Sequence, residues 1–232
     1  MRAIIRPFGP LSAVALLTLS LAAPLFTGCA SDQKKSAARS DADRYLRLAY
    51  IQMERGQTQQ AMETAQQALS RDPNSAEAHN FLGLIYLNLS QPKESVEQLR
   101  EAVRLNPYFS DAHNNLGVAY RESKEYDKAV KEFELALSDR NYKSPQKVQL
   151  NLGHVYQDQG LMQDALRSFQ RAVELDPKYL LGHLDLGTAY QTTGKAELAA
   201  REYCSVVSLA PESQEAARAR QLLEKMGKRC AP

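Results

Sequence analysis

The hydrophobic positions of this chain repeat at a constant interval. Gly83 and Gly117 lie 34 residues apart, and so do Gly153 and Gly187 further along the chain. A period of this length predicts that each repeat forms one supersecondary unit, which packs against its neighbours in a row. Five units fit the period, and they begin near Ala42, Ala76, Ser110, Gln146 and Leu180.

Four positions carry the same kind of residue in nearly every unit. The seventh is leucine, the eighth is glycine or alanine, the twentieth is alanine or serine, and the eleventh is tyrosine in four units. Small residues at positions eight and twenty let two antiparallel helices approach closely, and proline near position 32 ends the second helix because it has no N–H. The pattern resembles the tetratricopeptide repeat. It implies an all-α fold, a superhelix of five helix pairs over residues 42–212, followed by a capping helix and tail over residues 213–232.

Two places depart from the regular repeat. The third unit gains two residues between Ala136 and Gln146, which predicts a longer and more exposed loop. After Pro211, residues 212–227 form one more amphipathic helix without a partner helix, and such a helix supplies the polar outer face that a terminal repeat needs. Gly227 suits the end of this helix.

The first 28 residues have the three zones of a bacterial export signal. Arg2 and Arg6 supply positive charge, residues 11–23 are apolar and uncharged, and the motif LFTGC ends at Cys29. The apolar run is too short for a membrane-spanning helix, which needs about 20 residues. LFTGC resembles a lipobox, so we expect cleavage before Cys29 and acylation of Cys29, since several acyl chains hold a protein stably in a membrane. The alternative is an ordinary secretory signal that is cleaved elsewhere.

The segment that follows connects the lipid to the folded body. We assign residues 29–41 to the acylated cysteine and a flexible tether, because the stretch SDQKKSAARS is polar and small. Ala30 and Ser31 follow the cysteine, with no aspartate directly after it. This resembles the outer-membrane sorting pattern of enteric bacteria, so we expect a lipid-anchored outer-membrane protein whose body faces the periplasm.

Composition and charge narrow the possible functions. Hydrophobic residues make up 44% of the chain and charged residues 24%, which fits a folded protein. Without Arg2 and Arg6 of the signal, 27 basic residues balance 27 acidic ones, so no positive surplus favours nucleic acid. The sequence has no HExxH, GxSxG or phosphate-loop motif. We therefore predict a protein that is not an enzyme, with no cofactor, no metal and no small-molecule substrate.

The histidines do not change this prediction. His79, His113 and His183 occupy the fourth position of their units. Equivalent positions of successive repeats lie about 10 Å apart or more, which is too far to share one metal ion. We expect these three side chains to pack between helices, whereas His154 belongs to the concave side, where a ligand would bind.

Two cysteines remain besides Cys29. In an oxidising compartment Cys204 and Cys230 favour a disulfide. The tail after Gly227 is long enough to turn back to Cys204, which lies in the second helix of unit five. The bridge would staple the C-terminal cap, where fraying is greatest. The alternative is two separate thiols.

The first helices of such pairs line a concave groove, toward which positions two, five, nine and twelve point. In the first two units these positions form an apolar strip with polar edges, which is typical of a peptide- or protein-binding surface. The alternative is that the tether covers the strip. Position nine carries no lysine or asparagine in any unit, so the clamp with which some tetratricopeptide domains hold a C-terminal carboxylate is missing. The predicted groove residues are Leu46, Tyr50, Met53, Asn80, Leu84 and Leu87.

Several segments together resemble the type IV pilus pilotin lipoproteins. The resemblance covers roughly residues 45–172. It rests on AYIQMERGQTQQAMETAQQALSRDP, which starts at Ala49, on the Gln-Pro-Lys turn at residues 91–93, and on the Asn-Asn-Leu-Gly run at Asn114, followed by the expansion of unit three.

The resemblance implies a function. Pilotins bind secretin subunits, help them reach the outer membrane and promote their multimerisation, which pilus assembly and pilus-dependent motility require. It implies that a type IV pilus secretin subunit is the partner and that the groove of the early repeats is the contact. The alternative is a periplasmic tetratricopeptide adaptor lipoprotein that recruits other envelope proteins, such as cell-wall hydrolases.

Overall fold

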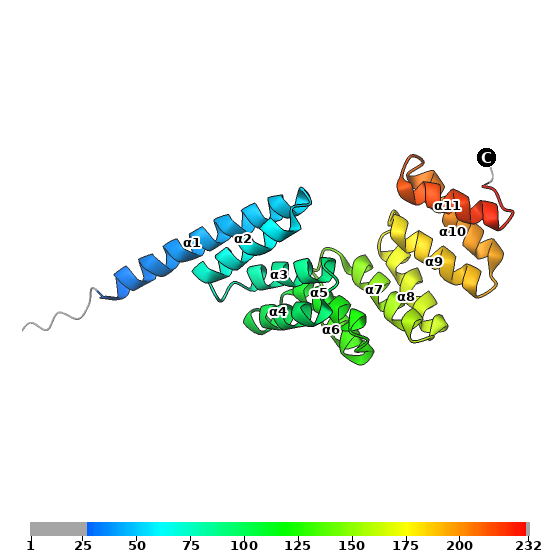
Figure 1. Cartoon of the computed structure of the whole chain (residues 1–232). Helices are drawn as coiled ribbons and strands as arrows, with labels where there is room; N and C mark the ends of the chain where they lie inside the picture. Colours follow the sequence, from blue (N-terminus) through cyan, green and yellow to red (C-terminus); the bar gives the residue numbers. More distant parts are fainter. Residues whose placement is uncertain (1–26, 231–232) are drawn as a thin grey trace, which may run out of the picture. The chain divides into compact units, whose positions relative to one another are not determined.

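The computed structural model describes the backbone of residues 27–230 and the side chains from residue 36 onward. Within this part all regular structure is α-helical, and the helices follow one another as antiparallel pairs joined by short turns (Figure 1). The helices are α1 (Thr27–Glu54), α2 (Thr58–Arg71), α3 (Ala76–Asn88), α4 (Pro92–Leu105), α5 (Ser110–Glu122), α6 (Tyr126–Ser138), α7 (Pro145–Asp158), α8 (Met162–Leu175), α9 (Leu180–Thr192), α10 (Ala196–Leu209) and α11 (Gln214–Lys225).

The predicted unit boundaries agree with the helix starts. α3 begins at Ala76, α5 at Ser110 and α9 at Leu180, as the period predicts, while α7 begins at Pro145, one residue early. Ten helices make five pairs and α11 stands alone after them. The all-α tetratricopeptide fold with a C-terminal capping helix is therefore confirmed.

α1 begins well before the expected start of the first repeat. It includes residues 31–40, which we expected to be a flexible tether. This expectation is corrected: the stretch has no glycine or proline, and its alanine, lysine, arginine and glutamine residues have high helix propensity. Residues up to 37 group separately from the compact unit that starts at residue 38. No helix in the described part is both long and apolar enough to cross a membrane. Residues 1–26, which hold most of the predicted signal, and the Cys29 side chain lie outside the described part.

Glycine at position eight lets the two helices of a pair touch. A Cβ atom on Gly117 would lie 2.6 Å from the Phe133 ring of α6, so the ring fills the space that a side chain on α5 would need. In unit two the small residue at position twenty is Ser95, whose buried hydroxyl donates to the Gly83 carbonyl over 2.8 Å. These contacts hold each pair together from the inside.

The turn inside each pair requires a residue with positive φ. Gly56, Gly160 and Gly194 supply it with φ of 74°, 76° and 73°, a region in which glycine has no Cβ to clash. Ser90 and Lys124 take the same place in units two and three, with φ of 57° and 60°. These two side chains therefore occupy strained positions.

Successive pairs are joined through buried first-helix positions. The tenth position of units two to five has no exposed surface, at Ile85, Ala119, Val155 and Ala189. α11 repeats this contact at the C-terminal end, where it packs on α10 with Ala216, Ala219 and Leu223 buried. The helix begins at a Ser213 cap and ends before Gly227, whose φ is 65°. Gly227 thus ends the capping helix, as predicted.

The expanded loop of unit three is fastened to the preceding helix pair. The Tyr142 hydroxyl donates to Asp111 Oδ1 over 2.9 Å, and the Ser110 hydroxyl donates to Asp139 Oδ2 over 2.8 Å. Burial raises the pKa of Tyr142 first, and the Asp111 carboxylate raises it further, so the phenol keeps its proton and remains a donor. The loop is longer than its counterparts, as predicted, but Tyr142 ties it to the N-terminus of α5.

Candidate partner-binding groove

Four of the six predicted groove residues present apolar surface to solvent. Tyr50 is 40% exposed, and its ring lies against Phe81 of the next unit, with centroids 4.0 Å apart. Phe81 occupies position six, which the sequence did not assign to the groove. The contact joins the first helices of units one and two through their aromatic rings. The accessible residues are Tyr50, Met53, Leu84 and Leu87.

The other two predicted residues lie deeper. Leu46 is only 8% exposed, because it packs in a hydrophobic core cluster that also contains Ala61 and Ala65 of α2. Its place in an exposed strip is therefore corrected: it supports the groove from below. Asn80 is 5% exposed, and its side chain is held by a hydrogen bond from Asn115.

Acidic side chains lie near this apolar end. Burial raises the pKa of Tyr50, and the carboxylates of Asp111 and Glu77 raise it further. The phenol therefore stays neutral, with a hydroxyl able to donate to a carbonyl or carboxylate of a partner. The N-terminal end of the groove therefore combines an apolar surface with one neutral hydrogen-bond donor, the Tyr50 hydroxyl.

A row of asparagines continues across units two, three and four. Asn115 Nδ2 donates to Asn80 Oδ1 over 2.9 Å, Asn114 Nδ2 to Asn115 Oδ1 over 3.4 Å, and Asn151 Nδ2 to Asn114 Oδ1 over 2.9 Å. A carboxamide has two donors and an acceptor with two lone pairs, so the row retains capacity for further hydrogen bonds. In the sequence only the adjacent Asn114 and Asn115 pointed to this row. The hydrogen bonds between units could not be predicted from residue spacing.

Polar pairs of side chains take the place of apolar residues toward the C-terminal units. Arg121 Nε donates to Asp158 Oδ2 over 2.7 Å, and His154 Nε2 lies 3.1 Å from Asp185 Oδ2. His154 also sets its ring edge-on to Phe169 at 5.3 Å between centroids. The His154 side chain is partly exposed and is oriented by these two contacts.

Two of the position-four histidines join helices by hydrogen bonds. His113 Nδ1 lies 2.7 Å from Glu132 Oε2, and Nε2 lies 3.1 Å from the Pro107 carbonyl. His183 has the same contacts with Glu202 and Pro177 at 2.7 and 3.1 Å. Both partners of each ring are acceptors, so both contacts are hydrogen bonds only when the ring carries two protons. The bonds to Glu132 and Glu202 raise the pKa of His113 and His183 against the opposing effect of burial.

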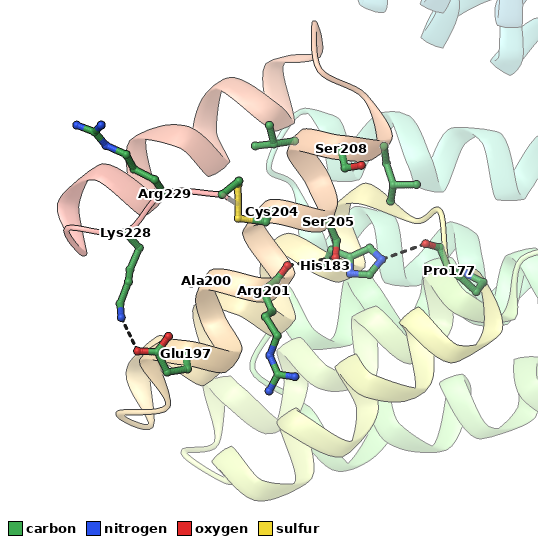
Figure 2. Close-up of a pocket in the computed structure, with 13 residues that line it drawn as sticks. Pro177, His183, Glu197, Ala200, Arg201, Cys204, Ser205, Ser208, Lys228 and Arg229 are labelled. Atoms are coloured by element: carbon green, nitrogen blue, oxygen red, sulfur yellow. Dashed lines mark hydrogen bonds and ion pairs between the residues drawn. A yellow bond between two sulfur atoms is a disulfide. The ribbon is translucent and has the colours of Figure 1, made fainter. Parts of the chain in front are cut away.

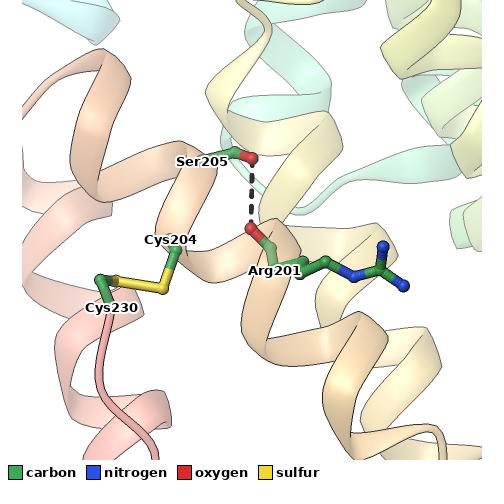
Figure 3. The surroundings of a disulfide bond; sticks show 4 residues. All are labelled: Arg201, Cys204, Ser205 and Cys230. Atoms are coloured by element: carbon green, nitrogen blue, oxygen red, sulfur yellow. Dashed lines mark hydrogen bonds between the residues drawn. A yellow bond between two sulfur atoms is a disulfide. The ribbon is translucent and has the colours of Figure 1, made fainter. Parts of the chain in front are cut away.

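The C-terminal cap is covalently joined to the last repeat. Cys204 of α10 and Cys230 of the tail form a disulfide, with Cα atoms 5.4 Å apart (Figure 3). A hollow of about 850 Å³ adjoins it and is lined by Arg201 and Lys228, among others (Figure 2). Lys228 is paired with Glu197. None of the predicted groove residues lines this hollow.

The described residues offer little for metal chemistry. Across residues 27–230, no group of three or more histidine, cysteine, aspartate or glutamate side chains is arranged to hold a metal ion. Each histidine at position four instead contacts a side-chain oxygen atom of the second helix of its unit and a proline carbonyl in the turn before its own helix.

Comparisons with known proteins agree with the repeat assignment. Family models described as the tetratricopeptide repeat match residues 46–108, 82–145 and 147–179. No curated protein matches the sequence. Many solved structures match the fold.

Three of these structures are informative. PilF of Pseudomonas aeruginosa is 24% identical with a TM-score of 0.68, and the alignment covers 83% of this chain and 93% of PilF. PilW, described as a widely conserved type IV pilus biogenesis factor, is 21% identical with a TM-score of 0.68, over 79% of this chain and 92% of PilW. YrrB, described as a tetratricopeptide protein with an unusual peptide-binding site, is 20% identical with a TM-score of 0.55, over 86% of this chain and all of YrrB (100%). At these identities the likeness establishes the fold.

Proposed function

Because this chain belongs to the tetratricopeptide-repeat family, whose members bind peptides and proteins, we propose that it is a non-enzymatic pilotin. In this proposal it is an outer-membrane lipoprotein that binds secretin subunits of a type IV pilus in the groove of its early repeats. It brings the subunits to the outer membrane and promotes their multimerisation. Pilus assembly and pilus-dependent motility depend on that step.

One observation carries the proposal: the accessible apolar surface of the groove is concentrated in units one and two. The asparagine row that begins at Asn80 continues from it. The residues that supply this surface are Tyr50, Met53, Leu84 and Leu87. An extended segment or a helix with apolar anchors fits such a surface, because apolar burial supplies affinity and side-chain amides supply orientation. The structural likeness to PilF and PilW adds support from proteins whose descriptions concern pilus biogenesis.

The lipid anchor belongs to the same proposal. Acylation at Cys29 would keep the chain at the membrane where secretin subunits must arrive. Replacing Cys29 with alanine removes the acceptor for the acyl chains and should release the protein from the membrane fraction. The alternative role as an adaptor for cell-wall hydrolases predicts the same release, so this test concerns the anchor alone.

Gene deletion tests the pilotin function. Deleting the gene should reduce heat-resistant secretin multimers and surface pili, and a plasmid copy should restore both. Unchanged multimers with normal pili would contradict the proposal. Recovery of hydrolases rather than secretin in a pull-down with the wild-type chain would favour the adaptor role.

A single substitution tests the groove. Leu84→Lys places a charge in the apolar strip and should weaken secretin binding at least tenfold, since an apolar anchor of this size contributes about 1.5–3 kcal/mol when buried. Leu135→Lys is the matched control, because Leu135 is 42% exposed on α6, outside the groove. Both variants should keep the helical circular dichroism of the wild type. Equal secretin affinity in the two variants would exclude the groove.

A further inference from the structure

α1 exposes a face that is buried in every later first helix. Leu48 occupies position seven and is 46% exposed, whereas the leucines at this position in units two to five are between 1% and 6% exposed. Ile51 occupies position ten and is 44% exposed, although that position is fully buried in the other four units. In those units the preceding helix pair covers the face, and α1 has no preceding pair in the described residues.

The C-terminal end of the row is built differently. α11 buries Ala216, Ala219 and Leu223 against α10 and turns Arg218 and Gln221 to solvent. A terminal helix with a polar outer face is what a finished repeat array requires. α1 breaks this rule with two large aliphatic residues, so its outer face has the chemistry of an internal junction.

We propose that this α1 junction face, formed by Arg44, Leu48 and Ile51, binds an amphipathic helix of a partner protein that imitates the second helix of a preceding repeat. A hollow of about 370 Å³ on this face is lined by Asp41, Arg44, Tyr45 and Leu48. The face is separate from the groove, because Tyr50 lies two residues, or about 200°, from Leu48 around the helix.

The internal junctions specify the chemistry of the partner helix. Position 27 is alanine in the second helices of units one to four, whereas unit five has Val206 there. In unit three Ala136 shares a buried cluster with Val148 and Val155 of α7. The partner helix therefore needs a small residue at the centre of its contact surface. The same position is alanine in the other internal second helices, at Ala68, Ala102 and Ala172.

Arg44 adds a second requirement. It stands at position three, where the later first helices have small residues or valine, at Ala78, Ala112, Val148 and Gly182. Arg44 pairs with Asp41 of the same helix over 3.3 Å on the exposed surface. A helix that packs over this pair covers the guanidinium, so an acidic side chain about one turn from the small residue fits as its second partner. A symmetric pair of α1 helices fits less well, because it would bring Arg44 of one copy against the same positively charged face of the other.

The helix of unit three provides a defined probe. A peptide with the sequence of residues 126–138, held helical by a staple on its outer face, carries Ala136 with Glu132 one turn before it. The full-length chain, purified as its host processes it, should bind this peptide saturably. Replacing Leu48 and Ile51 with glutamate should weaken binding at least tenfold, as should Ala136→Glu in the peptide.

Controls separate this face from the groove and from general apolar attraction. Leu135→Glu in the peptide and the groove variant Leu84→Lys in the chain should leave binding unchanged. The two variants of the chain should melt as the wild type does. Absence of saturable binding, or equal binding to the Leu48 and Ile51 variant, would overturn the proposal. So would vesicles of phosphatidylethanolamine and phosphatidylglycerol that protect residues 44–55 from hydrogen exchange when the peptide does not, because the face would then lie on lipid. A dimer that disappears in the double variant would identify a second copy as the occupant and would also overturn it.

Discussion

The Cys204–Cys230 disulfide should dominate the stability of the C-terminal cap. The two cysteines are separated by 26 residues, and the bridge encloses all of α11. A loop of this size loses about 3.5 kcal/mol of closure entropy from the unfolded state when it is cross-linked. Apart from the bridge, α11 is held only by the burial of its small apolar face against α10 and α9, because no further helix covers its other side in the described part of the chain. Without the bridge, α11 should therefore open far more often than the helices before it.

The perturbation is the double variant Cys204→Ala with Cys230→Ala, which removes the bridge and leaves no free thiol at either site. Hydrogen exchange followed by mass spectrometry should show α11 amides exchanging up to about 300-fold faster, since each 1.4 kcal/mol is a factor of ten. Amides of α3 should be unchanged, because a repeat array transmits stability mainly to neighbouring units. Reductant should accelerate α11 exchange in the wild type and leave the variant unaffected.

Two results would contradict a stabilising disulfide. One is an oxidised wild type whose α11 exchanges as fast as the double variant. The other is a native mass that does not increase by two hydrogen atoms on reduction, which would mean that the thiols are unpaired. The first would remove the energetic role of the bridge, and the second would remove the bridge itself.

Two further predictions concern the repeats. The pKa values of His113 and His183 are raised, so their bonds to the facing carboxylates stabilise the fold below pH 6.5, and this contribution disappears as the pH rises through the raised values. In urea titrations the free energy of unfolding should therefore fall more over this pH range in the wild type than in a variant with glutamine at both positions. Parallel curves for the two proteins would contradict the prediction. Lys124→Gly relieves the positive φ of the unit-three turn and should add about 0.5–1 kcal/mol in urea unfolding, whereas Lys131→Gly within α6 should subtract about 1 kcal/mol; a loss from both would show that the turn is not strained.

The repeat architecture could be predicted from residue spacing because its determinants are local and periodic. Glycine at position eight is needed wherever an aromatic ring of the second helix lies against the first, as at Gly117 and Phe133. Proline at position 32 follows the second helix in four of the five units, and unit three has Asn141 there. Because such requirements recur at the repeat period, the five repeats give the same evidence for the fold several times. The pairing of Cys204 with Cys230 was favoured because the chain offered no other partner beyond Cys29.

The groove and the ends of the array were harder to predict because they depend on what lies next to each helix. Leu46 follows the groove positions in sequence, yet it is buried because the alanines of α2 let α1 approach closely. The asparagine row and the Tyr50–Phe81 contact join side chains of different units, so no spacing rule within a unit reveals them. Residues 31–40 were assigned to a tether from their polarity, whereas helix propensity explains their conformation.

The proposed binding of a secretin subunit in the early groove can be measured in living cells. A photo-crosslinking amino acid at Leu84 in living cells tests it directly, with the same amino acid at Leu135 as the control. We expect a crosslinked species that contains secretin, identified by mass spectrometry of its peptides, from residue 84 and not from residue 135. A groove position that crosslinks no secretin while pili assemble normally would contradict it.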